Sequence, residues 1–88
     1  MTTEPKRTCY AILAGQRDEQ GYIPSLVTEG EAGHAPLAGR GTAAQPWHWG
    51  RTYDEAKETC ARMNQQDFGL TEREAAEIML SSMAADRL

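Results

Sequence analysis

The chain has 88 residues, of which 40% are hydrophobic and 25% charged, a balance typical of one small globular domain with a single core. No apolar run approaches the roughly 20 residues that a membrane-spanning helix needs, which argues against membrane insertion. Residues 1–7 have no apolar stretch after their charges, so we expect a frayed lead-in and no secretory signal. These features favour a cytoplasmic protein.

Nine Lys and Arg stand against thirteen Asp and Glu, and the resulting charge of −4 is spread unevenly. The acids and bases of residues 1–51 cancel at five each, whereas residues 52–77 hold seven acids and three bases. Such an acidic surface repels phosphate and attracts cations. It argues against direct nucleic-acid binding and favours a basic protein partner. The alternative is a solvated acidic face with no partner.

Two apolar segments predict a β-hairpin over residues 8–29. Residues 8–14 are apolar at both sets of alternate positions, which predicts a central strand that is covered on both sides. A polar segment between two glycines, residues 15–21, predicts the connecting loop. The second strand contains Pro24, which lacks a backbone donor, so we expect this strand at a sheet edge or with a bulge at the proline.

Residues 30–45 contain four glycines and no regular spacing of apolar residues, which predicts a long loop. The motif P-W-H-W-G follows at residues 46–50 and predicts an extended segment, a short third strand or an arm beside the hairpin. Alternation would place Trp47 and Trp49 on one side of this segment and His48 on the other. Two interpretations stay open: the indoles fill the core, or at least one belongs to an exposed interface.

Two T-x-x-E capping boxes, at Thr52 and Thr71, predict helices over residues 52–67 and 71–86. Gly69 is the expected left-handed cap between them. In the first helix, the apolar stripe consists of Tyr53, Ala56, Cys60 and Met63. In the second, the predicted core face consists of Ala75, Ala76, Met79, Leu80 and Met83. Ile78 lies off that face, which suggests a second contact or an exposed isoleucine.

Signatures of catalysis and of metal binding are not found in the sequence. There is no G-x-S-x-G, no C-x-x-C and no H-x-x-x-H pair, and the carboxylates of the helices fall at capping or exposed positions. We therefore expect no enzyme, no catalytic residue, no cofactor and no metal site. Cys9 and Cys60 are far apart in the sequence, and we expect them to be buried free thiols.

The segments YAILAGQRDEQGYIPSLVTEG and WGRTYDEAKETCARMN together resemble the HicB-like antitoxin domain. In that family a strand, an acidic turn with Gly-Tyr, a second strand and a G-x-T-x-x-E-A helix start follow in this order. The resemblance covers about half of the chain, and the long segment 30–45 replaces the family's short turn. It implies a small sheet covered by a helix and an antitoxin role. The matching residues are Asp18, Gly21, Tyr22, Ser25, Gly50, Thr52, Glu55 and Ala56.

We expect a single α+β domain over residues 1–88, with a small antiparallel sheet of two or three strands covered on one face by two C-terminal helices. Its expected function is that of a non-enzymatic acidic domain that binds protein. The narrower form of this hypothesis is an inhibitor or antitoxin-like partner of a basic nucleic-acid-handling protein. One alternative is a small-molecule-binding or catalytic site at residues 30–49, and another is a structural homodimer. The candidate protein interface consists of Trp47, His48, Trp49, Asp54, Glu58, Glu77 and Ile78.

Overall fold

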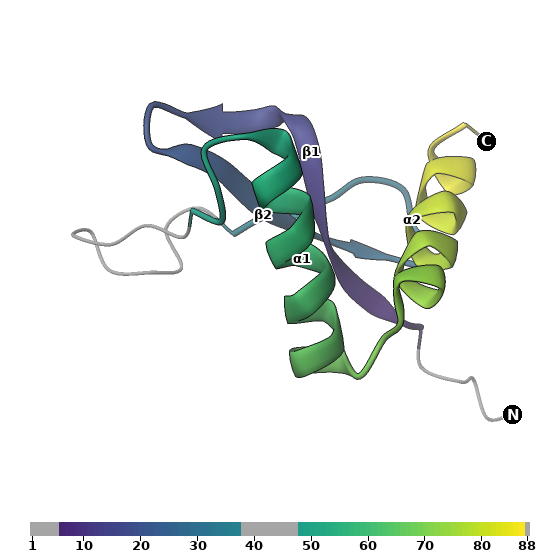
Figure 1. Ribbon diagram of the computed structural model, residues 1–88. Coiled ribbons are helices and arrows are strands. Elements are labelled where there is room, and N and C mark those ends of the chain that lie inside the picture. The colour runs from purple at the N-terminus through teal and green to yellow at the C-terminus, as the bar shows by residue number, and fades with distance from the viewer. Residues whose placement is uncertain (1–5, 38–47, 88) are drawn as a thin grey trace, which may run out of the picture.

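The computed structural model describes residues 6–37 and 48–87 and contains one antiparallel sheet with two helices after it (Figure 1). The strand order is β1-β2-β3. This arrangement confirms the expected α+β class. Three parts of the sequence predictions lie outside the described residues: residues 1–5 of the lead-in 1–7, residues 38–45 of the long loop, and the first two residues of the P-W-H-W-G motif, including Trp47. The elements are β1 (Thr8–Asp18), β2 (Gly21–Thr28), β3 (Ala35–Pro36), α1 (Tyr53–Phe68) and α2 (Glu72–Asp86).

The pairing of β1 with β2 is interrupted by a bulge beside Pro24. The sequence predicted a bulge as one of two possibilities, because proline has no backbone N–H to donate. Ile12 pairs with Pro24, but the next pair is Arg17 with Tyr22, so four residues of β1 lie opposite one residue of β2. Pairing then resumes and extends β1 to Asp18, whereas the sequence predicted a loop over residues 15–21. The strands can continue because a tight turn follows, in which the backbone N–H of Gln20 donates to Asp18 Oδ1 at 2.8 Å.

The outer edge of β2 is paired by two segments that lie far apart in the sequence. β3 pairs with Ser25 and Leu26, and the N–H of Leu37 donates to the carbonyl of Pro24 at 2.9 Å. Further along the same strand, the N–H of Tyr22 donates to the carbonyl of Gly50 at 2.8 Å. The P-W-H-W-G segment thus lies beside the hairpin at its glycine, and part of the predicted loop 30–45 is a short strand.

Two glycines allow the hairpin and the start of α1 to meet at this point. A Cβ on Gly21, whose φ is +141°, would lie 2.5 Å from the carbonyl oxygen of Gly50. A Cβ on Gly50 would lie 2.7 Å from the backbone nitrogen of Ala56. Gly21, Gly50 and Ala56 thus form a close backbone junction at the start of α1.

The core consists of two clusters that share β1. Cys9 and Ala11 pack with Ala75 and Ile78 of α2, whereas the alternate residues Tyr10 and Ile12 pack with Ala56 and Cys60 of α1. Because successive residues of a strand point to opposite sides, the helices cover different sides of β1 rather than one common face. Figure 1 shows β1 between them. The apolar residues on both sides of segment 8–14 predicted cover on both sides, but the prediction of a central strand is wrong, because β1 lies at the edge of the sheet and β2 in its middle.

Candidate protein-binding groove

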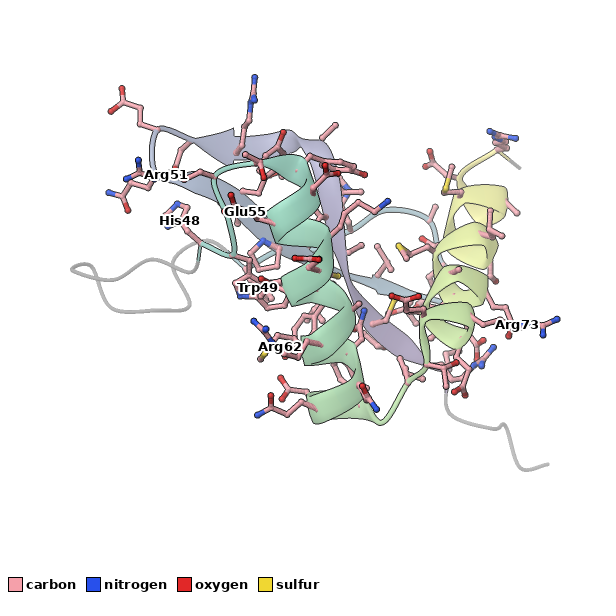
Figure 2. The ribbon with its side chains drawn as sticks, in the orientation of Figure 1. His48, Trp49, Arg51, Glu55, Arg62 and Arg73 are labelled. Carbon is pink, nitrogen blue, oxygen red and sulfur yellow. The ribbon has the colours of Figure 1, made fainter. Side chains whose placement is uncertain are left out.

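The three described residues of the P-W-H-W-G motif, His48, Trp49 and Gly50, are anchored to the hairpin, and Trp47 lies outside the described residues. Trp49, which is labelled in Figure 2, is half-buried. Its ring packs edge to face on that of Tyr10, with ring centroids 4.9 Å apart. His48 Nε2 lies 2.8 Å from Asp18 of the hairpin. Trp49 therefore belongs to the core on the α1 side, as one of the two interpretations expected, and His48 is engaged with a carboxylate.

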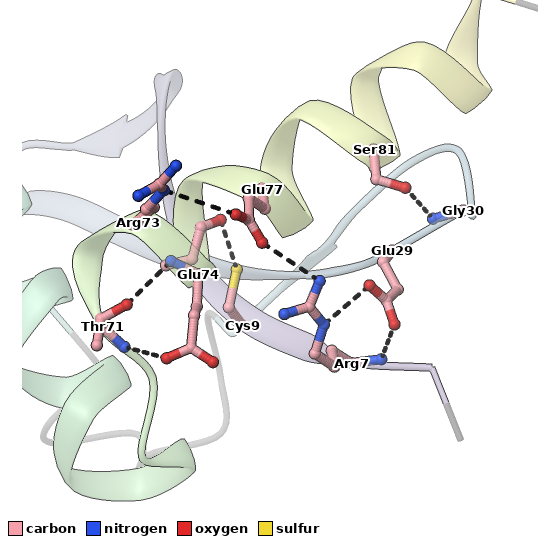
Figure 3. Close-up of polar contacts among 10 residues, drawn as sticks. Arg7, Cys9, Glu29, Gly30, Thr71, Arg73, Glu74, Glu77 and Ser81 are labelled. Atoms are coloured by element: carbon pink, nitrogen blue, oxygen red, sulfur yellow. Dashed lines mark hydrogen bonds and ion pairs between the residues drawn. The ribbon is translucent and has the colours of Figure 1, made fainter. Parts of the chain in front are cut away.

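The acidic candidates lie on two separate surfaces. Asp54 and Glu58 are exposed on α1, one helical turn apart. Glu77, on α2, instead lies 3.7 Å from Arg7, which also binds Glu29 at 2.9 Å (Figure 3). Glu77 thus belongs to a local charge network that joins the N-terminal end of β1 to α2. It does not lie on the same surface as Asp54 and Glu58.

Ile78 is fully buried, so the expectation that it lies off the core face and belongs to an interface is wrong. The inward stripe of α2 is Ala75, Ile78 and Ser82, whereas Leu80 is 64% exposed and Met83 is 53% exposed. Ser82 is buried without penalty because its hydroxyl donates to the carbonyl of Glu31 at 2.7 Å. Of the predicted core face, Ala75 is buried and Met79 packs against the core, whereas Ala76, Leu80 and Met83 are exposed.

A groove of about 400 Å³ lies between α1 and α2, with Ile12 of β1 among its lining residues. Alanines form its walls at Ala61 and Ala76, and Met79 lies at its α2 side. Two carboxylates line it from opposite helices, Glu58 from α1 and Glu72 from α2. Lys57 also lines the groove, but its ammonium lies 5.4 Å from the centre of the Tyr53 ring, a position typical of a cation–π contact. The groove thus combines an apolar interior with acidic residues on both sides.

Asn64 holds α1 against the free edge of β1. Its Oδ1 accepts from the backbone N–H of Tyr10 at 2.7 Å, and its Nδ2 donates to the carbonyl of Tyr10 at 3.1 Å. An amide side chain is suited to this because it offers a donor and an acceptor side by side. The sequence carries a signal for this role, because Asn64 follows Cys60 by four residues and so lies on the apolar stripe of the helix.

A second hollow of about 290 Å³ lies beside the C-terminal half of α2. Leu13 and Val27 line it from the sheet, and Met83 and Asp86 line it from the helix. Met79 lines both this hollow and the groove. Apolar surface therefore continues along one flank of α2, where the sequence predicted core. Neither cavity is lined by His48 or Trp49.

The two thiols are buried and free, as expected. The Cys60 thiol donates to the carbonyl of Tyr10 at 3.3 Å, and burial raises the pKa values of both Cys9 and Cys60 to about 11. A thiol with so high a pKa is a poor nucleophile at neutral pH. Among the described residues, no three His, Cys, Asp or Glu side chains gather closely enough to hold a metal ion.

No protein-family model, curated protein or solved structure matches the chain. Within residues 6–37 and 48–87, no helix combines the length and the apolar character that crossing a membrane requires. The groove between α1 and α2 is therefore interpreted from its own geometry and charge.

Proposed function

We propose that the protein is a small, non-enzymatic acidic domain that binds another protein in the groove between α1 and α2. The observation that carries this proposal is the groove itself, which is lined by Ile12 and three alanines and by carboxylates from both helices. Asp54, one turn before Glu58, extends the acidic side. Such a site favours a partner that presents an apolar side chain flanked by basic ones.

The narrower proposal is an inhibitor or antitoxin-like role against a basic nucleic-acid-handling protein. It is supported by the acidic helices, which would compete with nucleic acid for a basic surface, and by the resemblance to HicB-like domains. A cytoplasmic location fits this proposal, because two buried free thiols are ordinary in a reducing compartment.

Two other proposals each have one observation in their favour. The first is a small-molecule or catalytic site at residues 30–49. It is supported by the contact of 2.8 Å between His48 and Asp18, since such a site needs a histidine with a polar partner. The second is a homodimer. Ile78 is buried and cannot form its interface, but the exposed Leu80 and Met83 offer an apolar surface for it. The acidic groove is favoured over both because it joins apolar and charged residues in one cavity.

The test is affinity capture from cells that make the protein, with the wild type compared with a variant that carries Asp54→Lys and Glu58→Lys. We expect basic proteins that the wild type captures to be lost from the variant, because its groove would repel them. The matched control carries Glu19→Lys and Glu31→Lys, two exposed acids outside the groove. Equal capture by all three proteins, with unchanged circular dichroism, would refute the proposal.

A further inference from the structure

The unused hydrogen-bonding edge of β1 lies in the groove. In an antiparallel pair, the N–H and C=O of alternate residues point toward the partner strand and away from it. The carbonyl of Arg7 accepts from Glu29, so the odd-numbered residues at this end of β1 bond to β2. Tyr10 points its backbone groups the other way, to Asn64. Ile12, two residues later, must present its N–H and C=O to the same free edge.

Ile12 is only 8% exposed, but within the described part of the chain its outward backbone groups are not hydrogen-bonded as those of Tyr10 are. Within residues 6–37 and 48–87, no side chain forms with these groups a pair of bonds like those of Asn64. Residues 69–71 join the two helices, and Ile12 is among the residues that line the groove between them. An open strand edge of this kind is a template for an additional strand.

We infer that the groove binds an extended segment of a basic protein, which adds as a strand to the free edge of β1 at Ile12. This inference rests on the proposed function and names the form and chemistry of its partner. Charge selects the occupant: Glu58 and Glu72 line opposite sides, and Asp54 lies next to Glu58. Side chains of an added strand alternate between the α1 side and the α2 side, so each side can receive a basic residue.

Small side chains make room for the added backbone. Ala61 of α1 and Ala76 of α2 line the groove, and a volume of about 400 Å³ falls within the range of ordinary ligand pockets. Met79 is the adaptable contact for an apolar side chain, since its flexible thioether can follow different shapes. Main-chain bonds to Ile12 would supply affinity, and the carboxylates would supply the preference for basic sequences.

The probe is a capped, fluorescein-labelled heptapeptide, Lys-Lys-Val-Val-Lys-Lys-Val, whose paired lysines place a basic side chain on each side of an extended strand. We expect it to bind the protein in fluorescence anisotropy and to shift the backbone amide resonance of Ile12. The same peptide with alternate backbone nitrogens methylated should bind at least tenfold more weakly, because it cannot complete the ladder. A peptide with glutamate in place of lysine should also bind at least tenfold more weakly. Binding that survives N-methylation, or leaves the amide of Ile12 unshifted, would overturn strand addition.

Two variants of the protein test whether the peptide binds in the groove. Ala76→Phe fills the groove from α2 and should abolish binding of the lysine–valine peptide. Ala84→Phe makes the same change at another exposed alanine of α2, outside the groove, and should leave binding intact. Equal binding to both variants would reject the groove as the site. If no peptide binds but capture of basic proteins still depends on Asp54 and Glu58, strand addition fails while the proposed function stands.

Discussion

At the scale of single residues, Asn64 joins the two parts of the fold. It is 2% exposed and bonds to both backbone groups of Tyr10, so α1 is fixed to β1 by polar contacts as well as by packing. A polar side chain in an apolar stripe is tolerated in a core only when its hydrogen bonds are made. The sequence predicted the stripe but not the purpose of its asparagine, because the partner is a backbone 54 residues away.

Replacing this side chain should destabilise the domain. Each net hydrogen bond contributes about 0.5–1.5 kcal/mol, so we expect Asn64→Ala to lower the free energy of unfolding by about 1–3 kcal/mol. The amide of Tyr10 should also exchange faster with solvent. Urea denaturation and hydrogen exchange measure the two effects. Gln65→Ala, at the exposed neighbouring position, is the control. Equal stability of the two variants would show that the contact is unimportant.

The contact between Asp18 and His48 lowers the pKa of the Asp18 carboxyl, which can be tested by titration. Hydrogen bonding from His48, and then from the backbone of Gln20, holds the pKa of the Asp18 carboxyl below its ordinary value. A carboxyl with a depressed folded-state pKa adds stability above its unfolded pKa, and that stability is lost as pH falls through the folded pKa. Because Asp18 is exposed, this contribution is local to the hairpin tip and residues 48–50.

We expect His48→Ala to raise the pKa of the Asp18 carboxyl toward its ordinary value, because the variant lacks the largest contributor to the shift. The measurement is an NMR titration of the carboxyl carbon of Asp18 between acidic and neutral pH. His34→Ala is the control, since His34 lies near Gln16 rather than Asp18. An unchanged pKa in the His48 variant would show that the imidazole does not bind the carboxylate in solution.

At the scale of elements, α2 shows where sequence periodicity misleads. Its stripe of Met79, Leu80 and Met83 has helical spacing and large side chains, and it was predicted as core. Ala75 is buried as predicted and Met79 packs against the core, but Leu80 and Met83 are exposed and the helix buries Ile78 and Ser82 in their place. The small residues allow close approach to the side of β1 that carries Cys9 and Ala11, and the serine satisfies a loop carbonyl. Hydrophobicity alone could not predict this, because the fit depends on a strand with small residues on that side.

Two alanine substitutions on α2 distinguish the observed face from the predicted one. We expect Ile78→Ala to lower the free energy of unfolding by about 2–5 kcal/mol, since it leaves a cavity in a packed core. Leu80→Ala should change it by less than about 0.5 kcal/mol, as is usual at exposed sites. Urea denaturation of both variants measures the difference. If Leu80→Ala were the more destabilising, the helix would be rotated relative to the structure.

At the scale of the whole molecule, the fold class and both helices followed from the sequence, but the groove did not. Capping boxes and apolar spacing are local signals, and they predicted the helices within a few residues. The groove depends on the two helices lying on different sides of β1, an arrangement that is settled by packing between distant segments. The charges of Asp54 and Glu58 were predicted, whereas their meeting with Glu72 beside Ile12 required the three-dimensional structure.

The oligomeric state decides between the groove and the homodimer. Leu80 and Met83 are the exposed large hydrophobic residues of α2, whereas a stable interface takes roughly 20–30 residues from each partner. We therefore expect a monomer in sedimentation velocity at micromolar concentrations, with the groove open. Leu80→Glu with Met83→Glu should leave the sedimentation coefficient unchanged. A dimer that this double variant dissociates would instead assign the flank of α2 to self-association, and the acidic groove would then have to bind its partner beside a second copy of the chain.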